Sequence, residues 1–439
     1  AFKWCSSYFL QSMHSTEGVA ERFAPLAAKV ESQIGGELPA AIRFWDGSEI
    51  SSVEPGTAAD TVIVKDRRAL SYVLARPDQV GIGRAWVSGD LDLDGDLKRV
   101  MDAGSKMYGL ELSAAENFSV IAQAARLGAI KFPPPKPPES EAKVRGRIHS
   151  LLRDRDAVQY HYDVSNDFYR MILGPTMVYS CAYFSSPEDT LEEAQTRKLD
   201  VICRKLDLQP GDRFLDIGCG WGSLVLHAAT HFGVKAVGVT LAEEQAKLGR
   251  QRIRDAGLED SCEIRVLDYR EIEDGPFDKI ASVGMYEHVG SAQLDVYMRR
   301  LLELSRPGGL VLNHGIVRNQ EDNEPDDGFI RRYVFPDGEL HYVSAVIEAL
   351  EKAGLHLEDS EALGAHYALT LRKWVDNLAA NKEAAVAEVG EERERIWRLY
   401  MTASIGAFER TDVSLQQLLA VVPGATNPRP LARPSYLAS

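Results

Sequence analysis

The stretch Phe214-Leu-Asp-Ile-Gly-Cys-Gly-Trp-Gly222 decides the fold, because it joins a short apolar run to a glycine-rich loop. A strand that ends in such a loop and opens into a helix is typical of an α/β protein with a parallel sheet. The glycines let a ligand press against the backbone at the carboxyl end of the sheet, where nucleotide-like ligands usually bind. The stretch therefore predicts a ligand site at the end of the first strand of this sheet.

Strand-like and helix-like runs alternate from this stretch onward, as they do in a parallel α/β sheet. The predicted strands are residues 213–217, 235–239, 263–267, 279–283 and 309–313. Between them, residues 242–256 form a predicted helix that ends at Gly257. This part of the chain is therefore predicted to be one α/β domain.

The residues around the loop favour S-adenosylmethionine over a dinucleotide, although both classes of protein use a glycine loop of this kind. A NAD site needs an acidic residue roughly 20 positions further on to bind the ribose hydroxyls, and its loop has the spacing G-x-G-x-x-G. Here the second strand ends Gly238-Val-Thr-Leu241, with Gln245 one helical turn later. The third strand ends Leu267-Asp-Tyr-Arg270, which offers an acid and an aromatic ring to an adenine.

Composition excludes several other classes of protein. The chain has 439 residues, with 50 Lys+Arg against 65 Asp+Glu, and its net charge of −15 argues against a nucleic-acid partner. Its five cysteines are an odd number without metal-type spacing, so we expect reduced thiols and no metal site. No run approaches the ~18 apolar residues of a membrane span, and the apolar run near the N-terminus is too short for a signal peptide. We expect a cytoplasmic protein.

A proline-rich segment, residues 132–139, predicts an extended linker between two domains. The N-terminal domain, residues 1–131, is predicted to be a smaller α+β domain with strands at 41–45 and 61–64, and the glycines of residues 80–90 suggest close backbone packing. Residues 90–96 begin like a calcium loop, but Met101 occupies the position of the bidentate glutamate, so an edge strand and turn is favoured. Residues 140–422 form the larger domain, and residues 423–439 are predicted to be a disordered tail.

A basic amphipathic segment follows the linker at residues 143–155. Its charged residues are Lys143, Arg145, Arg147, Arg153 and Arg155. Such a segment can lie on anionic lipid, and it can equally be a solvated helix that docks between domains. The sequence leaves both interpretations open.

Six ordered motifs within residues 140–420 resemble those of the cyclopropane fatty acid synthase family, which includes the mycolic acid cyclopropane synthases. The motifs are Leu215-Asp-Ile-Gly-Cys-Gly-Trp-Gly222, His161-Tyr-Asp-Val-Ser-Asn-Asp-Phe-Tyr169, Tyr179-Ser-Cys-Ala-Tyr-Phe184, Gly284-Met-Tyr-Glu-His-Val-Gly290, Asn313-His-Gly-Ile316 and His366-Tyr-Ala-Leu-Thr-Leu371. The N-terminal part resembles, more weakly, the extra domain of the members that act on phospholipids. The resemblance implies a Rossmann-like class I methyltransferase domain beside a smaller, lipid-facing N-terminal α+β domain.

The resemblance also implies a reaction. The double bond of an unsaturated acyl chain attacks the methyl group of S-adenosylmethionine, and the resulting carbocation loses a proton and closes a cyclopropane ring. Such a site must hold an apolar chain, exclude water and supply a base. In this family the base is thought to be bound bicarbonate, and the residues carried over to its binding and to catalysis are Cys181, Glu287, His314 and Tyr367, with the backbone of Ile316. Taken singly, the cysteine, histidine and tyrosine could be ordinary core residues.

The cofactor contacts that the resemblance implies lie in four segments of the chain. They are Tyr179, Ser180, Gly218, Cys219, Gly220, Thr240, Leu241, Gln245, Tyr269 and Arg270. Asp216 is expected to order the loop or to contact the methionine amino group. The rings of Tyr162 and Tyr286 could face the cation or simply pack in the core.

One departure concerns Ser404, which stands where several relatives carry a cysteine, so no role is carried over to it. The first alternative function is a same-fold enzyme that makes methylene- or methyl-branched chains. The second is a catalytically silent lipid-binding protein, against which the complete bicarbonate-binding set argues. The expected substrate is an unsaturated phospholipid at the inner membrane surface. Relatives of this kind include homodimers.

Overall fold

The structure is a computed structural model that describes residues 14–54, 56–105, 113–130, 133–142, 153, 164–320, 328–427, 429, 431 and 435–437. The chain divides into two compact units. The first comprises residues 1–141, 327–329 and 390–406, and the second comprises residues 142–326, 330–389 and 407–439. Residues 390–406 thus belong to the first unit, although the sequence analysis assigns them to the larger domain.

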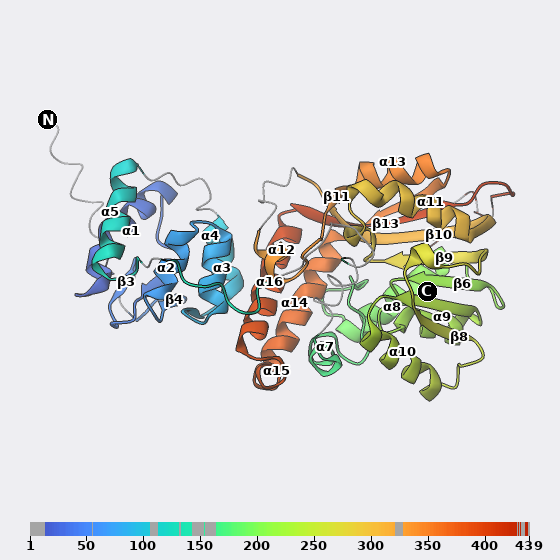
Figure 1. The fold of residues 1–439 in the computed structure, drawn as a ribbon, viewed down its shortest axis with the longest axis horizontal. Helices are drawn as coiled ribbons and strands as arrows, with labels where there is room; N and C mark the ends of the chain where they lie inside the picture. Colours follow the sequence, from blue (N-terminus) through green and yellow to red (C-terminus); the bar gives the residue numbers. More distant parts are fainter. Residues whose placement is uncertain are drawn as a thin grey trace. The chain divides into compact units, whose positions relative to one another are not determined.

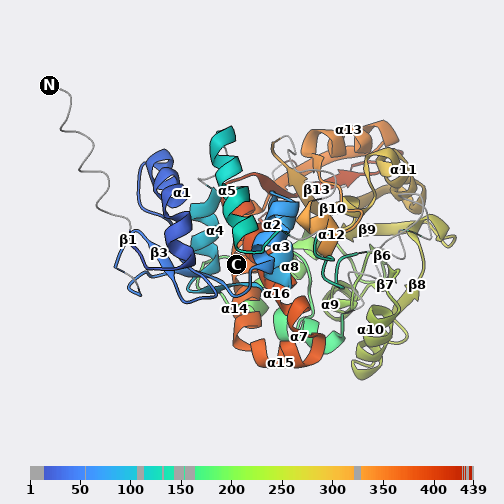
Figure 2. The same cartoon turned by 60° about the vertical axis from the view of Figure 1, so that its left-hand side comes forward.

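The first unit contains a five-stranded sheet with the order β1-β3-β2-β4-β5. The strands are β1 (His14–Ser15), β2 (Ala41–Arg43), β3 (Glu49–Ser51), β4 (Thr61–Val64) and β5 (Leu91–Asp94). The helices are α1 (Val19–Ile34), α2 (Arg68–Ala75), α3 (Gln79–Val87), α4 (Leu97–Ser105) and α5 (Ala114–Arg126); α1 and α5 lie side by side in both views (Figures 1 and 2). Both strands predicted for this region and the edge strand β5 are confirmed.

Close backbone packing in α3 is confirmed. A Cβ atom added to Gly81 would lie 2.0 Å from the carbonyl oxygen of Arg76, and one added to Gly83 would lie 2.3 Å from the ring of Phe329. The same helix is also hydrogen-bonded to Arg395 of α16 (Glu391–Glu409). Trp86 Nε1 donates to the Arg395 carbonyl oxygen (3.0 Å), Arg395 Nε donates back to the Trp86 carbonyl oxygen (2.6 Å), and the guanidinium lies 4.4 Å from the indole centroid. This long-range clasp explains why residues 390–406 belong to the first unit.

The second unit contains an eight-stranded sheet with the order β12-β13-β10-β9-β6-β7-β8, in which β11 also pairs with β10. Its strands are β6 (Arg213–Ile217), β7 (Lys235–Thr240), β8 (Cys262–Val266), β9 (Phe277–Val283), β10 (Ser305–Arg318), β11 (His341–Tyr342), β12 (His356–Ala362) and β13 (Val413–Val421). The five strands β6 to β10 are parallel, whereas β13 runs antiparallel to β10 and β12. All five predicted strands are confirmed, as is the Rossmann-like class of the domain.

Helices cover both faces of this sheet. The helices of the second unit are α7 (Asn166–Leu173), α8 (Leu191–Lys205), α9 (Ser223–Phe232), α10 (Glu243–Asp255), α11 (Leu294–Leu304), α13 (Val343–Ala353), α14 (Gly364–Ala380) and α15 (Lys382–Val389). A short helix, α12 (Phe329–Tyr333), and the single turns η1 (Tyr269–Glu271), η2 (Tyr286–His288) and η3 (Ser291–Gln293) complete the described elements. In Figure 1, α11 and α13 lie on one side of the sheet and α9 and α10 on the other. Two hydrophobic cores, one on each face, result from strands that are apolar on both sides.

Within the described residues, no helix combines the length and apolar character that crossing a bilayer requires.

The loop between β6 and α9 folds as the glycine pattern predicts. Gly218, Gly220 and Gly222 all have positive φ angles, of 80°, 53° and 77°. A side chain is strained in that conformation, and a Cβ at Gly218 would also lie 2.6 Å from Met285 Cγ. The backbone N–H groups of Gly218 and Cys219 donate to the carbonyl oxygen of Val239 (2.9 and 3.0 Å), which fixes the loop against β7.

We expect Gly238→Ala to destabilise the protein by about 1–3 kcal/mol, because overpacking a tight interior has that cost. The new methyl group would lie 2.8 Å from Cys219 Sγ and 2.9 Å from Val225 Cγ2, so it would push the loop away from β7. Urea unfolding measures the effect. Gly36→Ala is the control, because nothing lies within 4 Å of that position; equal stabilities of the two variants would contradict the prediction.

Candidate active site

A cavity opens at the carboxyl ends of the parallel strands β6 to β9. Its lining includes all ten residues named as cofactor contacts, namely Tyr179, Ser180, Gly218, Cys219, Gly220, Thr240, Leu241, Gln245, Tyr269 and Arg270. The strand ends converge there because parallel strands bring their carboxyl termini to one edge of the sheet. The fold therefore gathers at one cavity residues that lie up to 91 positions apart in the sequence.

Two buried charged side chains, Asp216 and Lys198, also line this cavity, and each is 2% exposed. Lys198 Nζ donates to Ser180 Oγ (3.0 Å), whereas Asp216 Oδ1 has no hydrogen-bond partner within the described part of the chain. Burial raises the pKa of Asp216 to about 7, an effect that Lys198 partly offsets, and burial lowers the pKa of Lys198 to about 8. An unpartnered carboxyl oxygen beside an ammonium group fits a ligand that carries both an amino group and a carboxylate, as the methionine part of S-adenosylmethionine does.

The ends of β7 and β8 supply further polar groups to the cavity. Thr240 Oγ1 donates to Gln245 Oε1 (2.9 Å), so the amide N–H₂ of Gln245 can still donate to a ligand. Asp268, which is expected to contact an adenine, lines the cavity and also accepts hydrogen bonds from Arg270 Nε (2.8 Å) and Nη2 (2.7 Å). The ring of Tyr269 packs edge-on against Tyr297, with centroids 5.3 Å apart.

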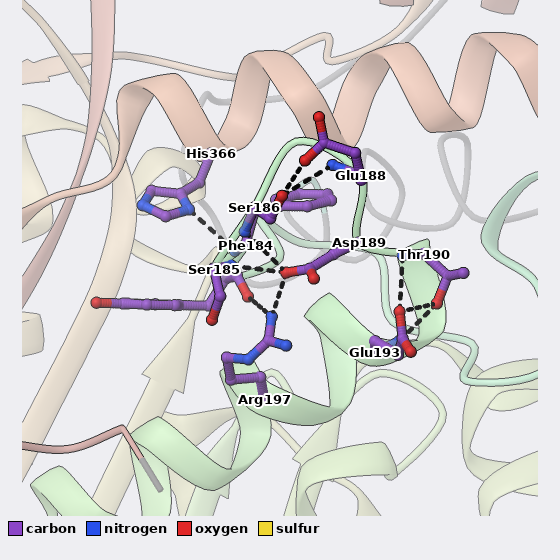
Figure 3. Close-up of polar contacts among 10 residues, drawn as sticks. Phe184, Ser185, Ser186, Glu188, Asp189, Thr190, Glu193, Arg197 and His366 are labelled. Carbon is purple, nitrogen blue, oxygen red and sulfur yellow. Dashed lines mark hydrogen bonds and ion pairs between the residues drawn. The ribbon is translucent and has the colours of Figure 1, made fainter. Parts of the chain in front are cut away.

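The segment 179–184 is held at several points along its length. Gln195 Nε2, from α8, donates to the Ser180 carbonyl oxygen (2.8 Å), and the Ala182 N–H donates to Thr370 Oγ1 (3.0 Å). Figure 3 shows the far end, where the Phe184 N–H donates to His366 Nδ1 (3.0 Å).

The loop that follows this segment is tied to the start of α8. Asp189 accepts hydrogen bonds from the backbone N–H of Ser185 (2.7 Å) and from Arg197 Nη1 (2.7 Å), as Figure 3 shows. Thr190 and Glu193 then form a capping box at the first turn of the helix. The segment 179–184 is therefore a well-supported wall of the cavity.

The five residues named for bicarbonate binding lie on β10 or are linked to it by a chain of contacts. The Ile316 N–H lies beyond the end of β9, so no parallel strand binds it, and it donates to Glu287 Oε1 (2.8 Å). The cross-strand partner of Ile316 on β13 is Leu415, whose carbonyl oxygen accepts from the Leu363 N–H (2.8 Å).

Leu363 extends this arrangement to the remaining residues. Its carbonyl oxygen accepts from the Tyr367 N–H (3.1 Å) and lies 3.7 Å from Cys181 Sγ. His314 lies two residues before Ile316 on β10, and side chains two positions apart lie on the same face of a strand. None of these five residues lines the cofactor cavity itself.

Burial leaves this second group of residues with unpartnered polar atoms. Glu287 Oε2, His314 Nε2 and Tyr286 Oη are buried and have no hydrogen-bond partner within the described residues. Burial raises the pKa of Glu287 to about 7 and raises that of the Cys181 thiol, while it lowers the pKa of His314 well below its usual value. Burial therefore favours the neutral forms of the thiol, the imidazole and the Glu287 carboxyl.

Three further residues named from the sequence are Tyr286, Tyr162 and Ser404. Tyr286 is fully buried, and a Cβ at Gly315 would lie 2.5 Å from its Cζ, so the ring packs directly on the backbone of β10. Tyr162 and most of the basic segment lie outside the described residues. Ser404 belongs to the first unit, where its Oγ donates to the Tyr400 carbonyl oxygen (2.9 Å) within α16.

Sequence reasoning missed three polar residues on the buried face of α8. Gln195, Lys198 and Lys205 are 0–2% exposed and interrupt a pattern of apolar residues that face the core. Polar residues at positions where the helical period requires apolar ones are a signal that could have found them. Gln417, which contacts His314, gave no local signal because its partner lies on another strand.

Comparison with solved structures defines the class of protein. Cyclopropane synthase MmaA2 from Mycobacterium tuberculosis is 31% identical, with a TM-score of 0.59, over 63% of this chain and 100% of the other. Mycolic acid cyclopropane synthase CmaA1, in complex with SAH and CTAB, is 33% identical, with a TM-score of 0.58, over 61% of this chain and 98% of the other. The fold and the cavity at its strand ends are those of a class I S-adenosylmethionine-dependent methyltransferase.

Sequence comparison is more specific. The family model for mycolic acid cyclopropane synthetase matches residues 149–418, so the chain belongs to that family. A probable fatty acid methyltransferase of Pseudomonas putida is 42% identical over 88% of this chain and 93% of its own length. The cyclopropane-fatty-acyl-phospholipid synthase of Escherichia coli K12 is 39% identical over 59% of this chain and 66% of its own.

We expect Glu287→Gln to stabilise the ligand-free protein at pH 8 more than at pH 5. The folded protein binds the Glu287 proton more tightly than the unfolded chain does, with a pKa of about 7 against 4.5. The free energy of unfolding therefore falls by about 3 kcal/mol as the pH rises from 4.5 to 7, and this contribution stays level above 7. Glutamine has no titratable proton, so the Glu287→Gln variant lacks this contribution to the pH dependence of stability.

Thermal unfolding at the two pH values checks the prediction. Glu303→Gln is the matched control, because its carboxylate is on the surface of α11, with a side chain that is 62% exposed. If the advantage of Glu287→Gln over the wild type were the same at pH 5 and pH 8, the carboxyl would not have a raised pKa.

Proposed function

We propose that the protein is a cyclopropane-fatty-acyl-phospholipid synthase, which adds a methylene group from S-adenosylmethionine across a cis double bond of an unsaturated phospholipid acyl chain. The observation that carries the proposal is the chain of contacts that links Glu287, Leu363, Cys181 and Tyr367 to the strand of His314 and Ile316, with unpartnered atoms on Glu287 and His314 within the described residues. A fatty-acyl methyltransferase needs a proton acceptor near the cofactor cavity, and this group of residues is suited to hold one.

Bicarbonate is the proton acceptor that this chemistry favours. S-adenosylmethionine supplies the methyl group, and the carbocation formed on the acyl chain must lose a proton before the ring closes. Bicarbonate combines a hydroxyl donor with carboxylate acceptors, so a protonated carboxyl, an imidazole N–H and a phenol can all bind it. Because Glu287, His314 and Cys181 are buried, they also keep water away from the cation.

The aromatic ring of Tyr286 contributes to the same environment. It is buried beside Glu287, and the face of an aromatic ring stabilises a positive charge. A neutral Cys181 thiol and a neutral His314 add no positive charge that would oppose the carbocation. These residues therefore favour a cationic intermediate that is quenched by deprotonation and not by water.

A second product is favoured by a specific comparison. The relatives that match most of this chain, from Pseudomonas putida and Mycobacterium tuberculosis, are named as probable fatty acid methyltransferases. If a 1,2-hydride shift first moves the positive charge to the methyl-bearing carbon, loss of a proton from that methyl group gives a methylene-branched chain, which a reductase could convert to a methyl branch. The cyclopropane product and the methylene-branched product both gain one methylene unit, so mass alone does not distinguish them.

Incubation of the enzyme with S-adenosylmethionine and oleoyl phospholipid vesicles tests the proposal. We expect a mass increase of one methylene unit and the strongly shielded proton NMR signals of a cyclopropane ring. Vinylidene signals without ring signals would overturn the cyclopropane assignment in favour of the branched product.

The variant Glu287→Gln should lose turnover and keep its affinity for S-adenosylmethionine by calorimetry, whereas Glu303→Gln should keep both. Removing carbon dioxide and bicarbonate from the buffer should lower wild-type turnover, and added bicarbonate should restore it. Full activity of Glu287→Gln would refute the role proposed for this carboxyl.

The phospholipid is met at a membrane surface, to which the basic segment binds through Arg145 and Arg147. Arg153 is committed elsewhere, because its Nε (2.8 Å) and Nη2 (2.7 Å) both donate to Asp337, which lines the cofactor cavity. We therefore expect the double variant Arg145→Glu and Arg147→Glu to bind phosphatidylglycerol vesicles at least about tenfold more weakly in sedimentation assays. Lys247→Glu with Arg254→Glu, on the exposed face of α10, makes the same change of net charge as a control. Equal binding of the two double variants would leave only a docking role for the segment.

A further inference from the structure

A row of polar side chains crosses three strands at the edge of the large sheet. Glu361 on β12 pairs with Gln417 on β13, and Gln417 pairs with His314 on β10. Side chains that are directly opposite in an antiparallel pair lie on the same face of the sheet. Lys205, at the end of α8, reaches this row, and the lysine, glutamine and histidine are each 1% exposed.

Within the row, Lys205 is the donor to Gln417, and the amide of Gln417 in turn faces His314. Lys205 Nζ donates to Gln417 Oε1 (2.7 Å) and to Glu361 Oε2, and Tyr183 Oη donates to Glu361 Oε1 (2.9 Å). Gln417 Nε2 lies 3.0 Å from His314 Nδ1. An ammonium group has no acceptor, so Gln417 must turn its oxygen to Lys205 and its N–H₂ group to the imidazole.

The orientation of this amide determines the state of His314. An N–H₂ group is only a donor, so Nδ1 must accept and cannot carry a proton. The single proton of the neutral imidazole is then on Nε2, at the far side of the ring from Gln417. His314 Nε2 is buried and has no partner within the described residues, and Glu287 binds the same strand two residues further on, at Ile316.

We propose that Lys205 and Gln417 are positioning residues that fix His314 as its Nε2–H tautomer, so that this N–H is held as a ready donor to the anion bound beside Glu287. The consequence for catalysis rests on the proposed function, whereas the tautomer follows from the hydrogen bonds alone. Lys205 thereby acts on the reaction without touching substrate or cofactor.

The row also opposes protonation of His314. An imidazolium would direct an Nδ1–H bond at the N–H₂ group of Gln417, which places two donors face to face. Burial lowers the pKa of His314, and the positive charges of Lys198 and Lys205 lower it further. A neutral donor at this position binds an anion and leaves that anion basic, which a proton acceptor requires.

Nitrogen NMR of the protein labelled at its ten histidines reads the tautomer directly. The signal of His314 is identified by its loss in His314→Gln. We expect a pyridine-like shift for Nδ1 and a pyrrole-like shift for Nε2 at neutral pH in the ligand-free wild type. A protonated Nδ1, in either the other tautomer or the imidazolium, would overturn the proposal whatever any variant does.

The variant Gln417→Glu tests the role of the amide. A carboxylate in its place accepts from Lys205 and also from His314, so the proton should move to Nδ1 and kcat/KM should fall about tenfold or more. The affinity for S-adenosylmethionine should not change. Gln416→Glu is the matched control: it makes the same substitution one residue earlier, where the side chain faces away from the row and its Oε1 accepts from Ser360 (3.2 Å). It should keep the wild-type tautomer and activity.

A second variant at the same position keeps the proposal testable if Gln417→Glu does not fold. Gln417→Met has a similar shape and no amide, so it should leave His314 as a mixture of tautomers with an intermediate activity. A wild-type tautomer in either Gln417 variant would overturn the role of Gln417. Failure of the proposed function is distinguishable, because it would appear as bicarbonate-independent turnover in a protein whose His314 still carries its proton on Nε2.

Discussion

The pairing of β10 with β13 is the constraint on which the proposed catalytic residues depend. Its unbroken register sets His314 opposite Gln417 and Ile316 opposite Leu415. Leu415 in turn holds Leu363, which places Cys181 and Tyr367. A slip of one residue would send every side chain of β10 to the opposite face of the sheet, so the residues beside Glu287 would no longer meet. The antiparallel pair therefore orders a site whose cofactor cavity belongs to the parallel strands.

Several buried polar atoms in the second unit lack a hydrogen-bond partner within the residues that the structure describes, and this arrangement has an energetic cost. Asp216 and Glu287 are carboxyl groups whose pKa values burial raises to about 7. An unsatisfied buried polar atom typically costs about 1–3 kcal/mol. Two hydrophobic cores on the faces of the sheet offset such costs and hold the groups in place. Ligands that satisfy these atoms would recover the lost hydrogen bonds, so ligand binding and stability are linked through the same residues.

Much of the second unit could be predicted from the sequence, because its information is local. Parallel strands buried on both faces are continuous apolar runs, and the glycines at 218, 220 and 222 match positions where a side chain is strained. The cofactor residues follow from motifs that stand at strand ends. The partners of His314 and Trp86 could not be predicted in this way. A motif indicates that a side chain is polar and buried, but a partner such as Gln417, some 100 residues distant, is set by the register of strands.

The segment 179–184 connects the two halves of the site through consecutive residues. Ser180 contacts Lys198 in the cofactor cavity, and the next residue, Cys181, packs against Leu363 in the second group. One peptide unit, with its fixed Cα spacing of about 3.8 Å, therefore joins the wall of the cofactor cavity to the second group of residues. An insertion or deletion within this segment would therefore shift one of the two groups of residues relative to the other.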